Sequence, residues 1–283
     1  MSAPDVAGPH RHIWLCADDY GISHSVNTAI RDLIMRGRIN ATSVMVTAPH
    51  FDRADAASLK VLNADMPRVA IGLHLTLTAP FRPLSQGFQP QRDDAFLPLN
   101  LTMRAAMWRR FRHEKLAIEI ATQLHSFVTA FGRPPDFVDG HQHVHLFPQI
   151  RDAVLNVVSE VAPNAWVRQC GRISRWGGLL DRKGLLLDLL SHRFRHHARK
   201  LGVRTNPAFA GTYDFKPDAD IARLFPAFLK RLPESSVVMC HPGFVDAELK
   251  RLDPLTTLRE REYAYFNSEA FPAVLAAHGL TLA

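Results

Sequence analysis

The chain has 283 residues, of which 47% are hydrophobic and 22% are charged. This composition is ordinary for a globular protein with a sizeable core, and it excludes disordered, collagen-like and coiled-coil chains. The net charge of +7 is concentrated in residues 168–204, which carry ten Lys or Arg and two Asp or Glu, so the remaining chain sums to −1.

Short apolar runs alternate with longer segments of helical periodicity, a pattern typical of a mainly parallel sheet with crossover helices. The expected strands are residues 13–17, 42–47, 69–73, 137–138, 165–167, 237–240 and 280–282, and the expected helices are residues 25–36, 52–62, 114–131, 150–161, 176–201 and 219–232. The proline-rich residues 79–112 show no clear period and are expected to form an insertion or lid. Because no linker is recognisable, we expect one domain over residues 1–283, with residues 1–11 flexible.

The cellular setting is predicted from what the sequence lacks. The N-terminal residues contain no apolar signal-peptide segment, and no apolar run is long enough to span a membrane. Cys16, Cys170 and Cys240 are too few and too far apart for a disulfide framework or a cysteine-based zinc site. These features favour a cytoplasmic location.

Polar side chains follow four of the expected strands. The pair Asp18-Asp19 comes directly after residues 13–17, and His74 comes after residues 69–73. His141, His143 and His145 follow residues 137–138, and His241 follows residues 237–240. Because the carboxyl ends of parallel strands gather on one rim, we expect these side chains to meet there.

The residue types at this rim favour a divalent metal. Adjacent buried carboxylates repel each other, and a cation offsets that cost. One Asp and two His leave positions open for water and substrate, which is the arrangement of a catalytic metal site. The second Asp is suited to act as a general base, and the late His is suited to donate a proton. The same ligand set also describes an iron-dependent oxygenase, and a non-catalytic sugar- or lipid-binding protein is a further alternative.

The stretches 17–23, 71–78, 139–148 and 239–244 resemble, in this order, the YdjC-like deacetylase family, which includes chitooligosaccharide and hopanoid-biosynthesis-associated deacetylases. The resemblance implies a distorted (β/α) barrel of the glycoside hydrolase/deacetylase type. It also implies a metal-dependent hydrolase that removes an N-acetyl group from an amino-sugar-containing substrate, either an oligosaccharide or a glycolipid, and releases acetate.

By matching position, the resemblance implies roles for individual residues. Asp19, His74 and His141 would bind the metal, Asp18 would be the general base, and His241 would protonate the leaving amine. The histidines favour zinc over magnesium, although magnesium or another transition metal stays open. Further candidates for substrate binding or for support of the site are Tyr20, His143, His145, Arg168 and Phe244.

The basic segment at residues 168–204 has several interpretations. A solvated helix face is the simplest, and peripheral contact of residues 185–200 with an anionic membrane, at the inner membrane face, is a second. Nucleic-acid binding is not expected because no nucleic-acid motif accompanies the charge. A homodimer would also be compatible with the sequence.

Overall fold

The structure is a computed structural model that describes residues 11–49, 51–64, 69–173 and 182–282. Residues 1–10, which make up most of the expected flexible segment, lie outside the described residues. Residues 176–181 of the expected helix at 176–201 also lie outside them.

The strands form one parallel sheet whose order is β5-β4-β3-β2-β1-β7-β6, with β8 paired to the start of β1. The strands are β1 (Arg11–Tyr20), β2 (Ala41–Val44), β3 (Ala70–Leu75), β4 (Phe137–Gly140), β5 (Trp166–Val167), β6 (Phe209–Ala210), β7 (Ser236–Cys240) and β8 (Leu280–Leu282). Each of the expected strands is present, with bounds shifted by a few residues. β6 was not predicted, because two residues carry too little pattern.

The sheet curls until its two ends meet. Val167 in β5 forms a parallel bridge with Thr205, which precedes β6. The amide of Phe209 in β6 donates to the carbonyl of Gly171, which follows β5, at 3.1 Å. The predicted distorted (β/α) barrel in a single domain is therefore confirmed.

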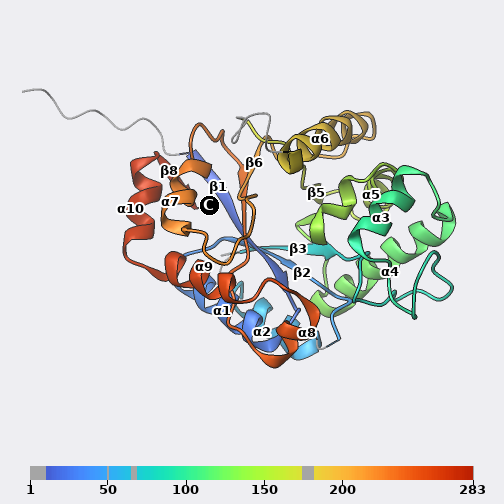
Figure 1. The fold of residues 1–283 in the computed structure, drawn as a ribbon, viewed down its shortest axis with the longest axis horizontal. Coiled ribbons are helices and arrows are strands. Elements are labelled where there is room, and N and C mark those ends of the chain that lie inside the picture. Colours follow the sequence, from blue (N-terminus) through green and yellow to red (C-terminus); the bar gives the residue numbers. More distant parts are fainter. Residues whose placement is uncertain (1–10, 50, 65–68, 174–181, 283) are drawn as a thin grey trace, which may run out of the picture.

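Helices surround this sheet, with α3–α6 gathered on one side and α7, α9 and α10 on the other (Figure 1). They are α1 (His24–Met35), α2 (Arg53–Val61), α3 (Leu99–Met107), α4 (His113–Phe131), α5 (Pro148–Val161), α6 (Arg182–Lys200), α7 (Ile221–Phe228), α8 (Ala247–Leu252), α9 (Thr257–Asn267) and α10 (Ala270–Ala277). A 3₁₀ segment, η1 (His141–Leu146), joins β4 to α5.

Helix α1 shows how the sequence specifies these elements. Ser23 adopts an extended backbone and its side chain accepts a hydrogen bond from the amide of Val26, which fixes the start of the helix. Val26, Ile30 and Leu33 are buried at helical spacing. Gly37, with a φ of +64°, follows the helix in the left-handed region that favours glycine.

Helix α3 lies inside the expected insertion at residues 79–112 and was not predicted. Near the start of the same insertion, the buried carboxylate of Glu119 in α4 accepts hydrogen bonds from the amides of Leu84 and Ser85 at 3.1 and 2.7 Å. The insertion is thus tied to α4 at these two amides. All three cysteines are buried and free, and no helix in the described residues is long and apolar enough to cross a membrane.

Candidate active site

The carboxyl ends of the strands open into a cavity of about 370 Å³. Six of the sequence-predicted site residues line it, namely Asp18, Asp19, His74, His141, His143 and His241. The other lining residues are Leu99, Gly140, Gln142, Asp214, Phe215, Met239, Asp253, Pro254 and Leu255. Side chains from distant parts of the chain therefore line one cavity, as the strand-end pattern predicts.

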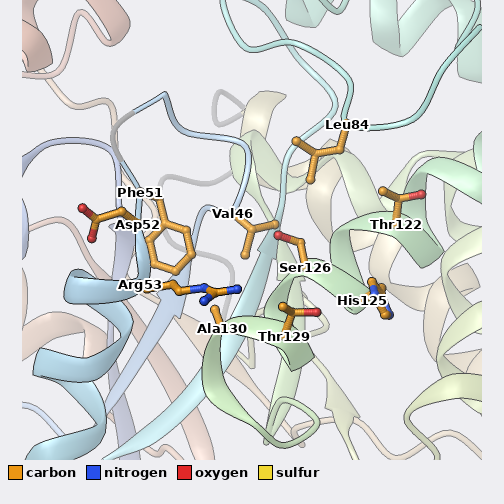
Figure 2. A pocket seen from close by; sticks show the side chains of 10 residues that line it. All are labelled: Val46, Phe51, Asp52, Arg53, Leu84, Thr122, His125, Ser126, Thr129 and Ala130. Atoms are coloured by element: carbon orange, nitrogen blue, oxygen red, sulfur yellow. The ribbon is translucent and has the colours of Figure 1, made fainter.

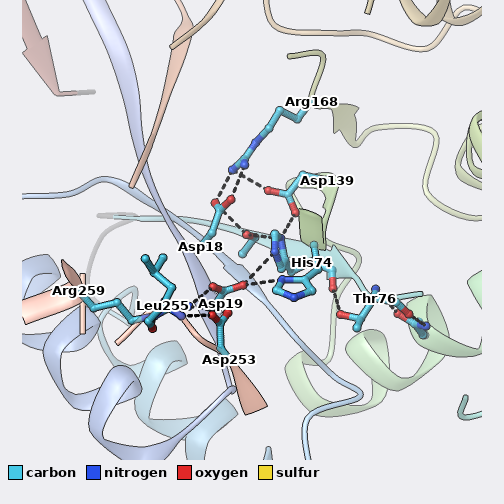
Figure 3. Close-up of polar contacts among 12 residues, drawn as sticks. Asp18, Asp19, His74, Thr76, Asp139, Arg168, Asp253, Leu255 and Arg259 are labelled. Atoms are coloured by element: carbon cyan, nitrogen blue, oxygen red, sulfur yellow. Dashed lines mark hydrogen bonds and ion pairs between the residues drawn. The ribbon is translucent and has the colours of Figure 1, made fainter. Parts of the chain in front are cut away.

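Two neighbouring carboxylates at the end of β1 face different partners (Figure 3). Asp19 has a φ of +68°, an uncommon conformation for a residue other than glycine. β1 loses its regular register with β2 between Ala17 and Tyr20, where both aspartates lie. Backbone departures of this kind are concentrated at functional sites, where surrounding contacts maintain them.

Asp19, His74 and His141 form a compact buried cluster. Oδ1 of Asp19 lies 3.2 Å from Nε2 of His74 and 3.1 Å from Nδ1 of His141. One possible ligand atom from each residue lies within 4.8 Å of the other two. The ring of Phe81 packs edge-on against His141, with the ring centroids 5.7 Å apart. One carboxylate oxygen and two imidazole nitrogens thus converge at a buried point on the cavity wall.

His74 is oriented from behind by a third carboxylate. Its Nδ1 donates to Oδ1 of Asp139 at 2.7 Å and also lies 3.0 Å from the hydroxyl of Ser43. This contact directs Nε2 towards Asp19, which is the usual arrangement of a metal-binding histidine supported by a carboxylate. Burial disfavours the charged ring, but Asp139 and Asp19 outweigh it and raise the pKa of His74 to about 10. A cation at Nε2 would therefore have to displace a proton.

Arg168 holds the other aspartate of the pair. Its Nη1 and Nη2 donate to the two oxygens of Asp18 at 2.6 and 2.7 Å, and Nη2 also lies 2.6 Å from Oδ2 of Asp139. All three side chains are buried. Cys16, Asp18 and Asp139 form a second cluster of possible ligand atoms, but the guanidinium already compensates its two carboxylates. This second cluster is therefore a poor candidate for a metal site.

Arg259, which comes from α9, pairs with Asp19. Its Nη2 donates to Oδ2 of Asp19 at 2.6 Å and to Oδ2 of Asp253 at 3.1 Å. Burial alone would raise the pKa of Asp19, but Arg259 and the two histidines hold it well below its usual range. Since Arg259 contacts Oδ2 and the imidazoles contact Oδ1, the two oxygens of Asp19 have separate partners.

His241 lines the cavity and is held through its backbone. Its amide donates to Oε2 of Glu262 at 2.5 Å, and the hydroxyl of Tyr213 donates to Oε1 of the same carboxylate at 2.6 Å. The ring of Phe215 packs edge-on against the imidazole, at 5.4 Å between centroids. Glu262 thus fixes the backbone while the ring remains at the cavity.

The loop after β4 separates His143 from His145. His143 lines the cavity, and its ring packs edge-on against Phe209. His145 is buried behind the wall, where its Nε2 donates to the carbonyl of Arg168 at 2.8 Å. A Cβ atom at Gly140 would lie 2.7 Å from Nδ1 of His145, so this position requires glycine. Burial of His145 lowers its pKa to about 4.

Two of the aromatic candidates, Tyr20 and Phe244, are not among the described residues that line the cavity. Tyr20 is buried, donates to the carbonyl of Asp55 and accepts a hydrogen bond from Arg31. Phe244 packs against Tyr263 and does not line the cavity. Both residues are adjacent to motif residues in the sequence, but this adjacency did not predict where their rings lie.

The site contains residues that were not among the sequence candidates. Asp139 could have been included, because it directly follows a strand just as Asp18 and His74 do. Arg259, Asp253 and Glu262 had no such signal, since helices and loops near the C-terminus bring them to the site. Phe215 and Leu255 line the cavity from irregular segments, which carry no periodic pattern.

A second hollow lies between α2 and α4, away from these residues (Figure 2). Its volume is about 480 Å³. Phe51 and Arg53 face the hydroxyl groups of Ser126 and Thr129 across it, and His125 lies at its edge. No predicted site residue is among the described residues that line this hollow.

Residues 12–277 match the family described as YdjC-like protein. A chitooligosaccharide deacetylase of Salmonella dublin is 27% identical over 272 residues, which are 93% of each chain. Another, from Yersinia pestis bv. Antiqua, is 28% identical over 247 residues, which are 82% of each chain. These relatives match across most of their own length.

Two solved structures share the fold. One is a protein of Enterococcus faecalis provisionally named a cellobiose-phosphate cleavage protein, with a TM-score of 0.71, 23% identity and coverage of 97% of each chain. The other is the lactam utilization protein of Thermus thermophilus, with a TM-score of 0.52, 14% identity and coverage of 96% of this chain and 98% of that one. Since the family match spans nearly the full length and the fold agrees, the chain belongs to the YdjC-like protein family.

Proposed function

We propose that this protein is a metal-dependent carbohydrate N-deacetylase, which hydrolyses the N-acetyl group of an amino-sugar-containing oligosaccharide or glycolipid and releases acetate. Family membership and the relatives named chitooligosaccharide deacetylase support this type of reaction. The observation that carries the proposal is the Asp19 carboxylate, whose Oδ1 lies within 3.2 Å of two imidazole nitrogens in a cavity that also contains Asp18 and His241.

The donor set suits a divalent cation. Asp19, His74 and His141 would hold it through one carboxylate oxygen and two imidazole nitrogens, and Asp139 would orient His74. Imidazole nitrogens favour zinc or another transition metal over magnesium, which prefers oxygen ligands. When bound, such an ion would polarise the acetamide carbonyl and lower the pKa of a coordinated water.

In the proposed mechanism Asp18 accepts the proton of the attacking water. It lines the cavity beside Asp19, and Arg168 contacts both of its oxygens from behind. A carboxylate has about four lone-pair directions, so this two-pronged contact leaves others open towards the cavity. The guanidinium fixes the direction of the carboxylate, which a general base requires.

In the proposed mechanism His241 protonates the leaving nitrogen. Its ring faces the same cavity, while Glu262 fixes the backbone and Phe215 restricts the ring. Protonation of the amide nitrogen makes the amine a competent leaving group, so cleavage of the C–N bond yields acetate and a free amino sugar. Asp18 and His241 thereby perform the two proton transfers of one hydrolysis.

An acetate-release screen tests the proposal. The purified chain is stripped with a chelator, reloaded separately with zinc, magnesium, manganese or cobalt, and incubated with N-acetylated sugars, oligosaccharides and glycolipids. We expect acetate and free amine to appear in equal amounts, with greatest activity in a transition-metal form and none in the stripped form. The matched control is each substrate without its N-acetyl group. Activity that survives complete metal removal would contradict the mechanism, and lack of acetate release from every substrate would contradict the function.

A further inference from the structure

Helix α3 and the residue that follows it expose three large apolar side chains, Leu99, Met107 and Trp108, while Met103 between them is partly buried against the core. Leu99, Met103 and Met107 are four residues apart, so they lie on one face of the helix. Met107 is 54% exposed and Trp108, which ends the helix, is 75% exposed. Isolated exposed apolar residues are common, but a group of them that includes a tryptophan exposed to three quarters of its surface is typical of an interaction surface.

The same segment is strongly cationic. Residues 99–113 contain Arg104, Arg109, Arg110 and Arg112 and no acidic residue. Each of these arginines is exposed, and Arg109 pairs with Asp152 at 3.2 Å. The other three form no ion pair within the described residues. Three guanidinium groups are therefore available to a partner beside the exposed indole.

The position of α3 connects this surface to the cavity. Leu99, the first residue of α3, lines the cavity that contains Asp18 and His241. Helices α3 and α6 both pack against α5 and η1, on the same side of the sheet (Figure 1). On α6, Leu186 and Leu189 are 42% and 53% exposed. Further apolar side chains are thus presented from the neighbouring helix.

We propose that the α3 face, defined as Leu99, Met103, Met107, Trp108 and the four arginines, binds an anionic lipid membrane surface. Tryptophan, methionine and leucine can enter the boundary between headgroups and acyl chains, while arginine side chains extend to the anionic headgroups. Each basic residue near such a surface strengthens binding. Because Leu99 belongs to both the face and the cavity wall, docking brings the cavity mouth close to the membrane.

We favour α3 over residues 185–200, for which membrane contact is one interpretation of the sequence. Several cations of residues 168–204 form contacts within the protein. Arg168 pairs with Asp18 and Asp139, and Arg172 pairs with Asp188. Arg195 donates a hydrogen bond to Gln169. Among the residues whose burial the structure describes, the exposed cations Arg193, Arg199, Lys200 and Arg204 follow the exposed leucines of α6. On α3 the cations and the apolar side chains are intermixed within one short segment.

Vesicle co-sedimentation with the full chain tests the proposal without any substrate. We expect binding to vesicles of phosphatidylcholine mixed with phosphatidylglycerol at low salt, weaker binding at high salt, and little binding to phosphatidylcholine alone. Trp108→Ala should lower the partition coefficient about tenfold, and Arg110→Gln about fivefold. The control, Arg223→Gln with Arg231→Gln, changes exposed charges near α7 and should leave binding close to the original level. Melting curves confirm that each variant folds.

Several outcomes would overturn the proposal. One is the lack of binding to phosphatidylglycerol vesicles, and another is binding that Trp108→Ala and Arg110→Gln leave unchanged. A third is self-association that Trp108→Ala abolishes, because the face would then bind a second copy of the chain. A fourth is binding to single-stranded RNA that displaces the vesicles and depends on the same residues. Deacetylase activity enters none of these measurements, so they stand apart from the proposed reaction.

Discussion

Arg168 and Asp18 lie 150 positions apart in the sequence and form a buried, two-pronged ion pair with N–O distances of 2.6 and 2.7 Å. The same guanidinium lies 2.6 Å from Asp139, which orients His74. One arginine therefore supports both the candidate general base and a candidate metal ligand. Its removal would leave two carboxylates buried without a cation.

Arg168→Met is therefore expected to destabilise the fold. Breaking a buried ion pair by removal of one partner typically costs roughly 3–5 kcal/mol. Urea denaturation measures the free energy of unfolding directly. Arg193→Met, a substitution on the exposed face of α6, is the control and should change that energy by less than about 0.5 kcal/mol. Equal stability of the two variants would contradict the structural role of Arg168.

Asp18→Asn should abolish proton transfer from water and leave the metal in place. The amide retains the shape of the carboxylate but has little basicity, so turnover should fall by about 100- to 10,000-fold. Acetate release gives the rate, and elemental analysis gives the metal content. Normal turnover would exclude Asp18 as the base, and loss of metal would show that it acts as a ligand.

His74→Ala should prevent stoichiometric metal binding, because it removes one of three protein ligands. Elemental analysis after dialysis against zinc provides the measurement. His125→Ala is the matched control, since His125 is an exposed histidine at the edge of the hollow in Figure 2. Equal metal content in the two variants would refute the ligand assignment of His74.

Asp139→Asn should weaken metal binding without removing it. The carboxylate of Asp139 fixes the ring of His74 from the far side, and loss of such a supporting contact typically lowers affinity about 10- to 100-fold. Competition with a fluorescent zinc chelator measures the change. Unchanged affinity would mean that His74 is oriented by Ser43 alone.

His145→Gln should reduce the dependence of stability on pH. Burial lowers the pKa of His145 from 6.5 to about 4, so between these values the unfolded chain takes up a proton that the folded chain does not. Its contribution to stability is complete above pH 6.5 and is lost as the pH falls towards 4, at up to about 1.4 kcal/mol per pH unit. Glutamine can still donate to the carbonyl of Arg168 but does not titrate. The free energy of unfolding is measured for both proteins at several pH values. Between about pH 4 and pH 6.5 it should fall more steeply with decreasing pH in the original protein than in the variant.

Much of the site could be predicted because strand ends carry a position-specific signal. Asp18, His74 and His241 each follow a short apolar run, and the geometry of a parallel sheet brings such positions together. The same rule would have included Asp139. The strand-end rule could not identify Arg259, because this residue comes from a helix far along the chain and no local pattern encodes its contact with Asp19.

The errors arose where neighbouring positions point in different directions. Tyr20 follows Asp19 directly but turns towards Asp55 and Arg31, away from the cavity. Helix α3 was missed because prolines and loops surround it and its apolar residues face both the core and the solvent. Such exposed apolar positions blur the periodicity that reveals an amphipathic helix.

Strand β1 has consequences for how the protein is made. It is synthesised before the other described strands and carries both aspartates, yet its partners β7 and β8 come from the last quarter of the given sequence, and Arg259 follows Asp19 by 240 positions. During translation Asp18 therefore has no ion-pair partner until Arg168 has been synthesised, and Asp19 has none until Arg259 follows near the end of the chain. A product truncated before α9 would contain most of the barrel but could not complete the centre, so such fragments should be inactive and dependent on chaperones.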